Sequence, residues 1–464
     1  MARQVSLMKV VGIVAEYNPF HYGHAYQIAK AKEEFGQDTP IVAVMSGDFV
    51  QRGKPAITGK WNRTEAALRM GVDLVIELPF TFACASADRF SHGAISLLNA
   101  TGIVTDLYFG SECTDLDLLQ KIAQVTAEEN PEYRALLKAN LGEGMSYAEA
   151  RESAIEAFFK NSGEPFDSSK LQEFLKSPNT ILAIEYLAAL IKTKSRIKPS
   201  LLERAGAAYH EKSIHAPLAS ASAIRNTVTK SLSTGTSDVS LLAKSLAGRM
   251  PSASLAPMLS EYSRGVRPVL PDDFLPEAVL LIRTRTEEDL SKIAYMGDHL
   301  SRRLKNAASD MRVPPDTGFS DAFHLACDTK RYARTRVNRA LMSLLAGQTI
   351  KDLEELKNPA YIRILGFTDK GRYLLKLMRK YKELPLIDKA SDFLEHGQNP
   401  LLTRMAELDL ISSDLRGMKA GYPYGHEFDR TVIRMKGHKA VPGSDNTGGH
   451  PQGSQGSLCR PASD

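Results

Sequence analysis

The stretch VVGIVAEYNPFHYGHAYQIAKAK, residues 10–32, decides the fold. It opens with the apolar run Val10–Val14, which is typical of a strand buried on both faces of a parallel sheet. Pro19 cannot donate to a sheet ladder and disfavours helical backbone at Asn18, so we expect the strand to stop near this turn. Apolar residues then recur at helical spacing from Ala25 onward, which predicts a helix.

Two histidines and a glycine, His21, Gly23 and His24, lie at the junction of this strand and helix. A helix N-terminus offers unpaired N–H groups and a partial positive charge, so it attracts phosphate. Gly23 has no Cβ to keep a phosphate from the backbone, and His21 and His24 lie one helical turn apart. We therefore expect both imidazoles to stabilise charge on an α-phosphate while pyrophosphate leaves. The alternative is that the two histidines cap the helix or lie on the surface.

More strands and helices alternate along the first 110 residues. This order, β-α-β-α-β, predicts an α/β fold with a Rossmann-like parallel sheet and right-handed crossovers. The predicted strands are 41–45, 73–78 and 106–109, and the predicted helices are 60–70 and 87–100.

Several residues near the ends of these strands are candidates for ligand contact. Gly110 follows a strand and would let the backbone approach an adenine or ribose, although a plain turn glycine is as good a reading. Asp48, Asp88 and Glu112 are candidates for binding Mg²⁺ with help from a triphosphate, but no spacing selects one of them.

Three basic residues follow the second strand. Lys54, Lys60 and Arg63 could contact phosphates or steer RNA. For each of them alone, a solvated surface charge is the better prediction.

Composition places the chain among ordinary globular proteins. Its 464 residues carry a net charge of +5 and only four scattered cysteines without a CxxC pair, so neither a zinc site nor a disulfide framework is indicated. A reducing cytoplasm fits this cysteine content. No apolar run reaches the length of about 20 residues that spans a bilayer, so no membrane partner is expected.

The second half of the chain reads as mainly helical. We predict a nucleotide-binding domain over residues 8–250, a helical and basic domain over 251–435, and a disordered tail over 436–464, which is rich in Gly, Ser and Pro. Residues 330–339 are the most basic stretch and would form a helix face able to neutralise RNA phosphates. Tyr332 in this stretch could stack on a base. The alternative to RNA contact is that the stretch forms a basic helix face exposed to solvent.

The His-x-Gly-His pattern resembles the signature of the nucleotidyltransferase superfamily. The longer string GIVAEYNPFHYGHAYQI resembles the bacterial tRNA(Met) cytidine acetate ligase family, and this similarity extends over residues 8–435. It is carried further by MSGDFVQRGKPAI, KWNRTEAALRMGVDLVIELPF, YFGSE, KSPNTILAIEYL and the basic stretch near residue 330.

The resemblance implies site residues. It makes His21 and His24 catalytic, and it adds Asn179, which otherwise reads as a helix cap, and Arg204 as ATP contacts. The segment 219–225 resembles the superfamily's second, phosphate-binding signature, but alanine stands where a Ser-Thr pair is usual, which leaves Ser222 and Arg225 as candidates. The full ATP-binding set is Val14, Ala15, Glu16, Tyr17, Asn18, Pro19, Phe20, His21, Tyr22, Gly23, His24, Ala25, Tyr26, Gln27, Gly110, Asn179 and Arg204, and the tRNA-binding set is Lys330, Arg331, Arg334, Arg336 and Arg339.

The resemblance also implies the reaction. Acetate would attack ATP, accompanied by Mg²⁺, to give acetyl-adenylate, and the acetyl group would pass to N4 of the wobble cytidine of elongator tRNA(Met). The residues alone leave two alternatives open. One is an adenylyltransferase acting on a small phosphorylated cofactor precursor, and the other is a non-catalytic RNA-binding protein. The residues alone do not identify metal ligands.

Overall fold

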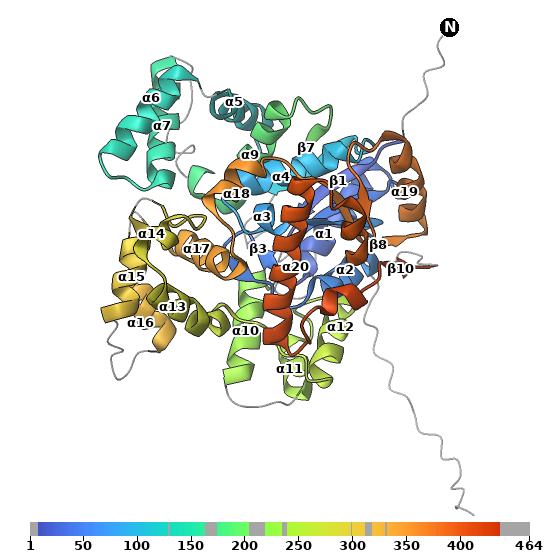
Figure 1. Cartoon of the computed structure of the whole chain (residues 1–464). Helices are drawn as coiled ribbons and strands as arrows, with labels where there is room; N and C mark the ends of the chain where they lie inside the picture. The colour runs from blue at the N-terminus through green and yellow to red at the C-terminus, as the bar shows by residue number, and fades with distance from the viewer. Residues whose placement is uncertain are drawn as a thin grey trace, which may run out of the picture.

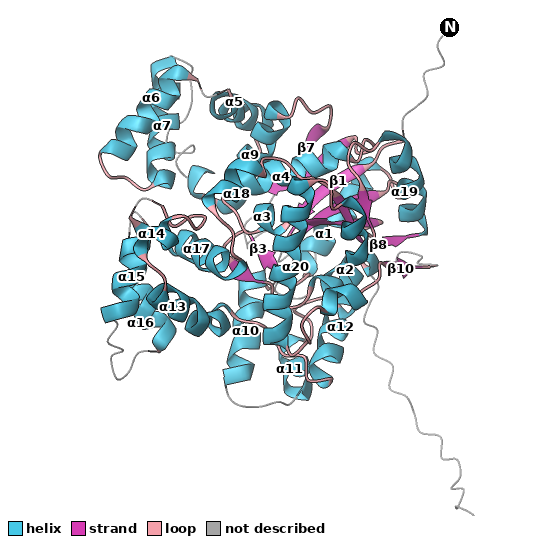
Figure 2. Cartoon of the chain, in the orientation of Figure 1, coloured by secondary structure: helices cyan, strands magenta, loops and turns pink. Residues whose placement is uncertain are grey.

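The computed structural model describes residues 8–128, 130–162, 174–203, 219–233, 239–297, 299–310, 318–329 and 332–436. Within these residues the main strands form one eight-stranded sheet, which Figures 1 and 2 show surrounded by helices. In spatial order its strands are β10 (Ile433–Met435), β8 (Ile362–Thr368), β5 (Leu74–Leu78), β2 (Ile41–Ser46), β1 (Val11–Ala15), β6 (Asp106–Ser111) and β7 (Lys198–Glu203), and β9 (Leu386–Ile387) also pairs with β8.

Strand β1 lies at the point where the chain reverses its direction of winding. The chain moves from β1 to β2 on one side and later returns to β6 on the other, and all three strands run parallel. Open α/β sheets bind ligands outside the carboxyl ends of the strands at such a reversal. The segment that follows β1 therefore enters the position where a ligand is expected.

Apolar strand residues divide between the two faces of the sheet. Val11 and Ile13 face the core formed with α1 (Tyr22–Phe35) and α2 (Lys60–Arg69). Alternate positions on the neighbouring strand, Val42 and Val44, face the larger core. That core contains the buried faces of α4 (Ala87–Ala100) and α9 (Pro178–Lys192), so helices cover both sides, as in a doubly wound fold.

The other elements of the first 263 residues surround this sheet. The short strands β3 (Phe49–Val50) and β4 (Lys54–Pro55) form a separate antiparallel hairpin. A small core of apolar residues lies between Ile57 and the helices that end this region. The helices are α3 (Phe80–Ala83), α5 (Leu116–Ala127), α6 (Pro131–Gly142), α7 (Tyr147–Ser162), α10 (Ala221–Ser233), α11 (Val239–Leu246) and α12 (Ser252–Ser263).

The remaining C-terminal region is mainly helical. Its α-helices are α13 (Leu275–Thr284), α14 (Glu287–Ser291), α15 (Leu300–Asp310), α16 (Phe319–Cys327), α17 (Arg334–Ala346), α18 (Ile350–Glu355), α19 (Asp369–Tyr381) and α20 (Pro400–Ala420). Its 3-10 helices are η2 (Pro271–Phe274), η3 (Ala390–His396) and η4 (His426–Asp429).

The predicted Rossmann-like α/β fold with a mainly helical C-terminal region is confirmed. The structure adds that β8 and β10, from the C-terminal region, extend the sheet, with β8 antiparallel to β5. The domain boundary near residue 250 stays a prediction, and residues 437–464 of the predicted tail lie outside the described part of the chain. Among the described helices, none combines the length and apolar character needed to cross a bilayer.

Candidate active site

The turn after β1 is a compact set of buried aromatic rings. Tyr17 has a φ of 48°, in the left-handed region that residues with a side chain rarely adopt, and the Asn18–Pro19 peptide is cis. The rings of Tyr17 and Phe20 are nearly inaccessible to solvent and lie 4.8 Å apart between centroids. His24 packs edge-on against Tyr17, with centroids 4.9 Å apart. Apolar packing therefore fixes the turn and one face of His24.

His21 and His24 also hold each other in place at the N-terminus of α1. His21 is the N-cap, and its Nδ1 accepts the Gly23 N–H at 3.0 Å, while His24 Nδ1 accepts the His21 N–H at 3.2 Å. The ring centroids are 3.9 Å apart. A ring nitrogen that accepts a hydrogen bond carries no proton, so each neutral ring bears its proton on Nε2. In this form both Nε2–H groups can donate to phosphate oxygens.

Gly23 has a steric role besides the predicted one. A Cβ at this position would lie 2.8 Å from His21 Cε1 and 3.1 Å from His21 Nδ1. The imidazole of His21 thus occupies the space that any side chain at position 23 would need. The glycine allows the capping geometry of His21 as well as close approach of a ligand to the backbone.

Polar contacts anchor the turn from several sides. The Asn18 Oδ1 accepts the Ile57 N–H at 2.9 Å, and the Asn18 backbone oxygen accepts from Arg225 Nη1 at 2.6 Å. Arg225 also donates to Ser222 Oγ at 2.9 Å, so the two residues of the degenerate second signature meet at the first signature. Nearby, burial raises the pKa of the Glu16 carboxyl, which accepts the Gln51 N–H at 3.0 Å.

Arg63 ties together the ends of two neighbouring strands. Its side chain is 1% exposed and donates to the backbone oxygens of Glu16 at 2.7 Å and Ser46 at 2.9 Å, and also to that of Gly47. The expectation that Arg63 is a solvated surface charge is therefore wrong. Its guanidinium donates hydrogen bonds to carbonyl groups just after β1 and at the end of β2 that would otherwise lack a partner. These bonds hold the turn in place.

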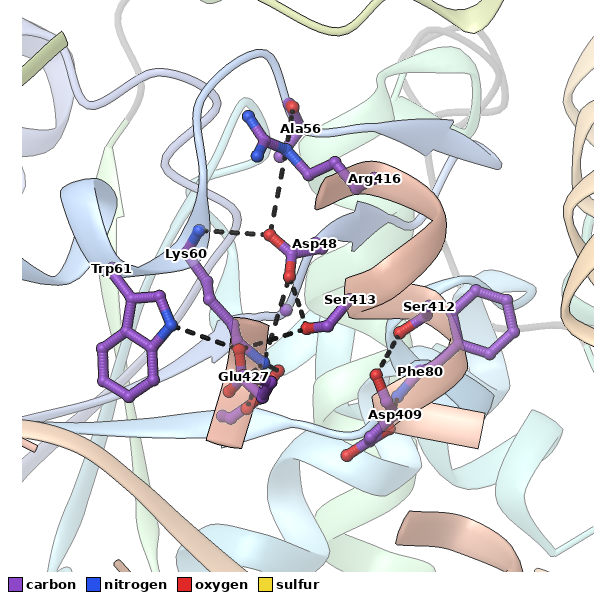
Figure 3. A network of polar contacts seen from close by, with 12 residues as sticks. Asp48, Ala56, Lys60, Trp61, Phe80, Asp409, Ser412, Ser413, Arg416 and Glu427 are labelled. Atoms are coloured by element: carbon purple, nitrogen blue, oxygen red, sulfur yellow. Dashed lines mark hydrogen bonds and ion pairs between the residues drawn. The ribbon is translucent and has the colours of Figure 1, made fainter. Parts of the chain in front are cut away.

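Lys60 is likewise a buried residue and not the surface charge that we expected. It is 2% exposed, and its Nζ lies 2.8 Å from Glu77. Its Nζ also lies 3.0 Å from Glu427, next to which Figure 3 shows it. Burial alone would lower the pKa of Lys60, but the carboxylates of Glu427, Glu77 and Asp48 raise it. This network joins α2 to β5 and to η4 near the C-terminus.

Asp48 belongs to the same network, which bears on its suggested role as a metal ligand. Its carboxylate accepts from Ser413 Oγ at 2.7 Å and lies 3.8 Å from the Arg416 guanidinium (Figure 3). Asp48 is thus paired with cationic side chains of the protein, so its carboxylate is not free to bind a metal ion. Within the described ranges, no group of three or more His, Cys, Asp or Glu side chains is placed to hold a metal ion.

Asn179 lies near the end of β6, the strand that contains Gly110. Gly110 is a partly exposed residue within β6, which extends to Ser111. The next residue but one, Glu112, accepts from Asn179 Nδ2 at 2.5 Å and from the Thr180 N–H at 2.9 Å. Asn179 therefore does not cap α9 through its own side chain. Glu112 holds it there. Two of the three carboxylates considered for Mg²⁺, Asp48 and Glu112, are therefore engaged within the protein, whereas Asp88 is exposed in the first turn of α4.

The two halves of the predicted ATP site face the same sheet edge. Gln27 on α1 donates to the backbone oxygen of Tyr108 on β6 at 3.1 Å, which connects the histidine-bearing helix to the strand that carries Gly110. Arg204, the remaining predicted ATP contact, lies outside the described residues. The ATP-binding role of the whole set stays a prediction.

Comparisons with known proteins agree with this arrangement. The chain matches the HIGH nucleotidyl transferase family over residues 8–423. It is 41% identical over 435 residues to the tRNA(Met) cytidine acetate ligase of Acetivibrio thermocellus, an alignment that covers 92% of this chain and 100% of the relative. The ligase of the same name from Caldanaerobacter subterraneus is 37% identical over 408 residues, or 88% of this chain and 94% of the relative.

The chain belongs to the tRNA(Met) cytidine acetate ligase family. The predicted resemblance is thus confirmed. Among solved structures, Thermotoga maritima TmcAL bound with alpha-thio ATP matches with a TM-score of 0.81 and 31% identity, over 93% of this chain and 100% of that one. The apo form of the same protein matches with a TM-score of 0.83 and 32% identity over the same shares.

The helix predicted to bind tRNA in this tRNA(Met) cytidine acetate ligase family member is only partly accessible. Arg334 is 51% exposed and pairs with Asp328 at 2.7 Å. Arg336 is half-buried and donates to the backbone oxygen of Gly297 at 3.2 Å, and Arg339 is half-buried and donates to that of Gln51 at 3.3 Å. Tyr332 is only 7% exposed, so its ring is packed inside the protein. The expectation that this ring stacks on a base is therefore wrong. Lys330 and Arg331 lie outside the described residues.

Sequence reasoning missed the buried network around Lys60. Glu77 lies in the middle of an apolar strand and Arg363 in another, and burial raises the pKa of Glu77 to about 7. A charged residue inside a strand that is otherwise apolar was the available signal, because such charges are rarely buried unless they are paired.

Proposed function

We propose that the chain is an ATP-dependent ligase that activates acetate as acetyl-adenylate and transfers the acetyl group to N4 of the wobble cytidine of elongator tRNA(Met). The observation that carries this proposal is the pair of imidazoles at the N-terminus of α1, 3.9 Å apart, with both Nδ1 atoms bonded to backbone N–H groups. The names of the curated relatives supply the acceptor and the acyl donor. They do not favour a cofactor adenylyltransferase or a non-catalytic RNA-binding protein.

In the first step, a carboxylate oxygen of acetate attacks the α-phosphorus of ATP. The new O–P bond forms as the bond to the β-phosphate breaks, and pyrophosphate leaves with the electron pair. His21 and His24 donate from Nε2–H to the phosphate oxygens on which negative charge grows. Arg225 fixes the turn through Asn18 and adds positive charge beside it.

In the second step, N4 of the cytidine attacks the acetyl carbonyl carbon. The C–N bond forms, the bond from that carbon to the phosphate oxygen breaks, and AMP leaves while N4 loses a proton. A mixed anhydride of this type is a good electrophile, so the protein mainly needs to position the two reactants. A covalent enzyme intermediate is not required.

The metal and the RNA contacts are further parts of the proposal. Mg²⁺ would reach the site with the triphosphate, because Asp48 and Glu112 are engaged within the protein and Asp88 is exposed in the first turn of α4. Arg334, with Lys330, Arg331, Arg336 and Arg339, would contact tRNA phosphates in the cytoplasm.

Acetate-dependent exchange of labelled pyrophosphate into ATP tests the first step without tRNA. We expect exchange with acetate and little exchange when acetate is omitted. Exchange that is equally fast without any carboxylate, or absent with acetate and other small carboxylates, would overturn the acetyl-adenylate proposal. Phosphorylated small molecules would then be tested as adenylyl acceptors.

A further inference from the structure

The β3–β4 hairpin connects the nucleotide turn to helix α17. On one side, the Gln51 N–H donates to Glu16 Oε1 at 3.0 Å, directly after β1. On the other side, the Gln51 backbone oxygen accepts from Arg339 Nη1 on α17 at 3.3 Å. The hairpin thus lies between the two parts of the molecule to which we assign ATP and RNA (Figure 1).

The tip of the hairpin is seated on the backbone of α17. Gly53 has a φ of 69°, and a Cβ there would lie 2.4 Å from the Arg339 nitrogen and 2.7 Å from the Asn338 carbonyl carbon. Only glycine permits both this backbone conformation and this contact. The position of the two residues on either side of Gly53, Arg52 and Lys54, is therefore fixed relative to α17.

These two residues carry positive charges that the described part of the chain leaves without a hydrogen-bonded or ion-paired partner. Arg52 is exposed and Lys54 is half-buried. Burial lowers the pKa of Lys54 most, and Arg225, Arg334 and Arg52 lower it further, with Asp272 opposing them. Among the nearby acids, Glu16 faces Arg225 and Arg52, and Asp328 pairs with Arg334. Asp272 accepts a hydrogen bond from Ser320 Oγ at 2.7 Å.

Such a concentration of cations is unfavourable in the free protein and is relieved by a polyanion. Arg225 lies at the nucleotide turn, whereas Arg334 lies at the exposed start of α17, and the hairpin tip lies on α17 itself. A ligand that meets Arg52, Lys54 and Arg334 must extend along α17, which fits successive phosphates of a nucleic acid strand better than one compact triphosphate.

We propose that Arg52 and Lys54 bind backbone phosphates of the RNA strand that carries the target base and so lead that base to the nucleotide site. This inference rests on the proposed function, since it assumes an RNA acceptor. The hairpin then has two roles. Its backbone forms hydrogen bonds with Glu16 and with α17, and its tip binds the RNA strand whose base must reach the adenylate.

The test is the double variant Arg52→Gln/Lys54→Gln, with Arg372→Gln/Lys376→Gln on α19 as the matched control. Both pairs remove two positive charges, and Arg372 and Lys376 are exposed on a helix that packs on β8 and β5. We expect the hairpin variant to bind tRNA at least about tenfold more weakly. The slope of the logarithm of the tRNA-binding constant against the logarithm of the salt concentration should be shallower by about 1 to 2. Each lost phosphate contact reduces the magnitude of this slope by about 0.7 to 0.9. The control should bind like the wild type.

The adenylation half-reaction separates RNA contact from triphosphate contact. Acetate-dependent pyrophosphate exchange without tRNA should stay within about twofold of the wild type in the hairpin variant, and Arg52→Lys/Lys54→Arg should restore tRNA affinity. A raised KM for ATP with unchanged tRNA affinity, or equal loss of affinity in the α19 control, would overturn the proposal. If the wild type shows no acetate-dependent exchange, the proposed function fails, whereas direct tRNA binding still decides the role of the hairpin.

Discussion

The guanidinium of Arg225 donates to the backbone oxygen of Asn18 at 2.6 Å, across 207 residues of sequence. This contact joins the second signature of the chain to the turn that presents His21 and His24. Because a peptide carbonyl accepts the bond, Arg225 fixes the backbone of the turn whatever side chain follows it. Arg225 of the degenerate second signature therefore supports the first signature both by a hydrogen bond and by its charge.

Replacing Arg225 by alanine should slow adenylation and also lower stability, because the hydrogen bond that is lost lies within the protein. A hydrogen bond from a charged group contributes about 1.5–3 kcal/mol to stability. The shift of the turn that carries His21 and His24 should in addition lower kcat/KM for acetate-dependent exchange by about 10- to 100-fold. Lys230→Ala, on the exposed side of the same helix, is the control and should behave like the wild type. Unchanged kinetics in Arg225→Ala would contradict the positioning role.

Replacing His24 by alanine should reduce acetate-dependent exchange by about 100- to 1,000-fold, the size of effect seen when one donor to a developing oxyanion is removed. The folded state should survive, since His21 remains the N-cap and the loss of the capping-box hydrogen bond from the His21 N–H costs about 1 kcal/mol. The melting temperature checks the fold, and His92→Ala, at an exposed hydrogen bond to Asn358, is the control. Normal turnover in His24→Ala would refute the role of the imidazole pair.

Gly23→Ala tests the steric relation between position 23 and His21. The added methyl group would lie 2.8 Å from His21 Cε1, so the ring must move and its Nε2 with it. We expect at least a tenfold loss in exchange rate, because small displacements of catalytic groups cost about this much or more. Gly142→Ala at the end of α6, where no atom lies within 4 Å of the new Cβ, should leave the rate unchanged. Retention of full activity in Gly23→Ala would show that the ring tolerates displacement.

Local patterns predicted the parts of the fold that local chemistry determines. The helix 87–100 was predicted with the bounds that the structure has, and the strands β1, β2 and β5 were predicted to within one residue at each end. Apolar runs closed by proline or glycine mark these ends. The turn with His21, Gly23 and His24 was identified for the same reason, since its chemistry lies within four residues.

Long-range pairing was beyond local patterns. Residues 362–368 form a strand antiparallel to β5, nearly 300 positions away, and nothing near them in sequence indicates that partner. Lys60 and Arg63 look like surface charges because their partners, such as Glu427 and the Glu16 carbonyl, come from distant segments. Arg339 was correctly seen as part of a basic helix, but its bond to Gln51 follows only from tertiary packing.

Lys60→Met tests how much the buried network contributes to the free energy of unfolding. The substitution leaves the carboxylates of Glu77, Glu427 and Asp48 without their shared cation, at 2.8, 3.0 and 3.9 Å respectively. Breaking one partner of a buried ion pair lowers the free energy of unfolding by about 3–5 kcal/mol, which urea titration would measure.

The control for that measurement is Lys30→Met, which removes an exposed pair with Glu33 and should cost no more than about 1 kcal/mol. If Lys60→Met and Lys30→Met proved equally mild, Lys60 would not be the cation that neutralises the network. Failure of Lys60→Met alone to yield folded protein would agree with the predicted direction.

In the proposed reaction, acetate reaches a tRNA base through an adenylate formed beside His21 and His24. The most direct measurement follows label from acetate onto elongator tRNA(Met) in the presence of ATP, with a second tRNA whose wobble cytidine is replaced by uridine. We predict that label is incorporated into the first tRNA only, as N4-acetylcytidine, and that AMP and pyrophosphate appear in step with it. Release of pyrophosphate with no label on the cytidine-containing tRNA, or equal labelling of both tRNAs, would rule out the proposed reaction.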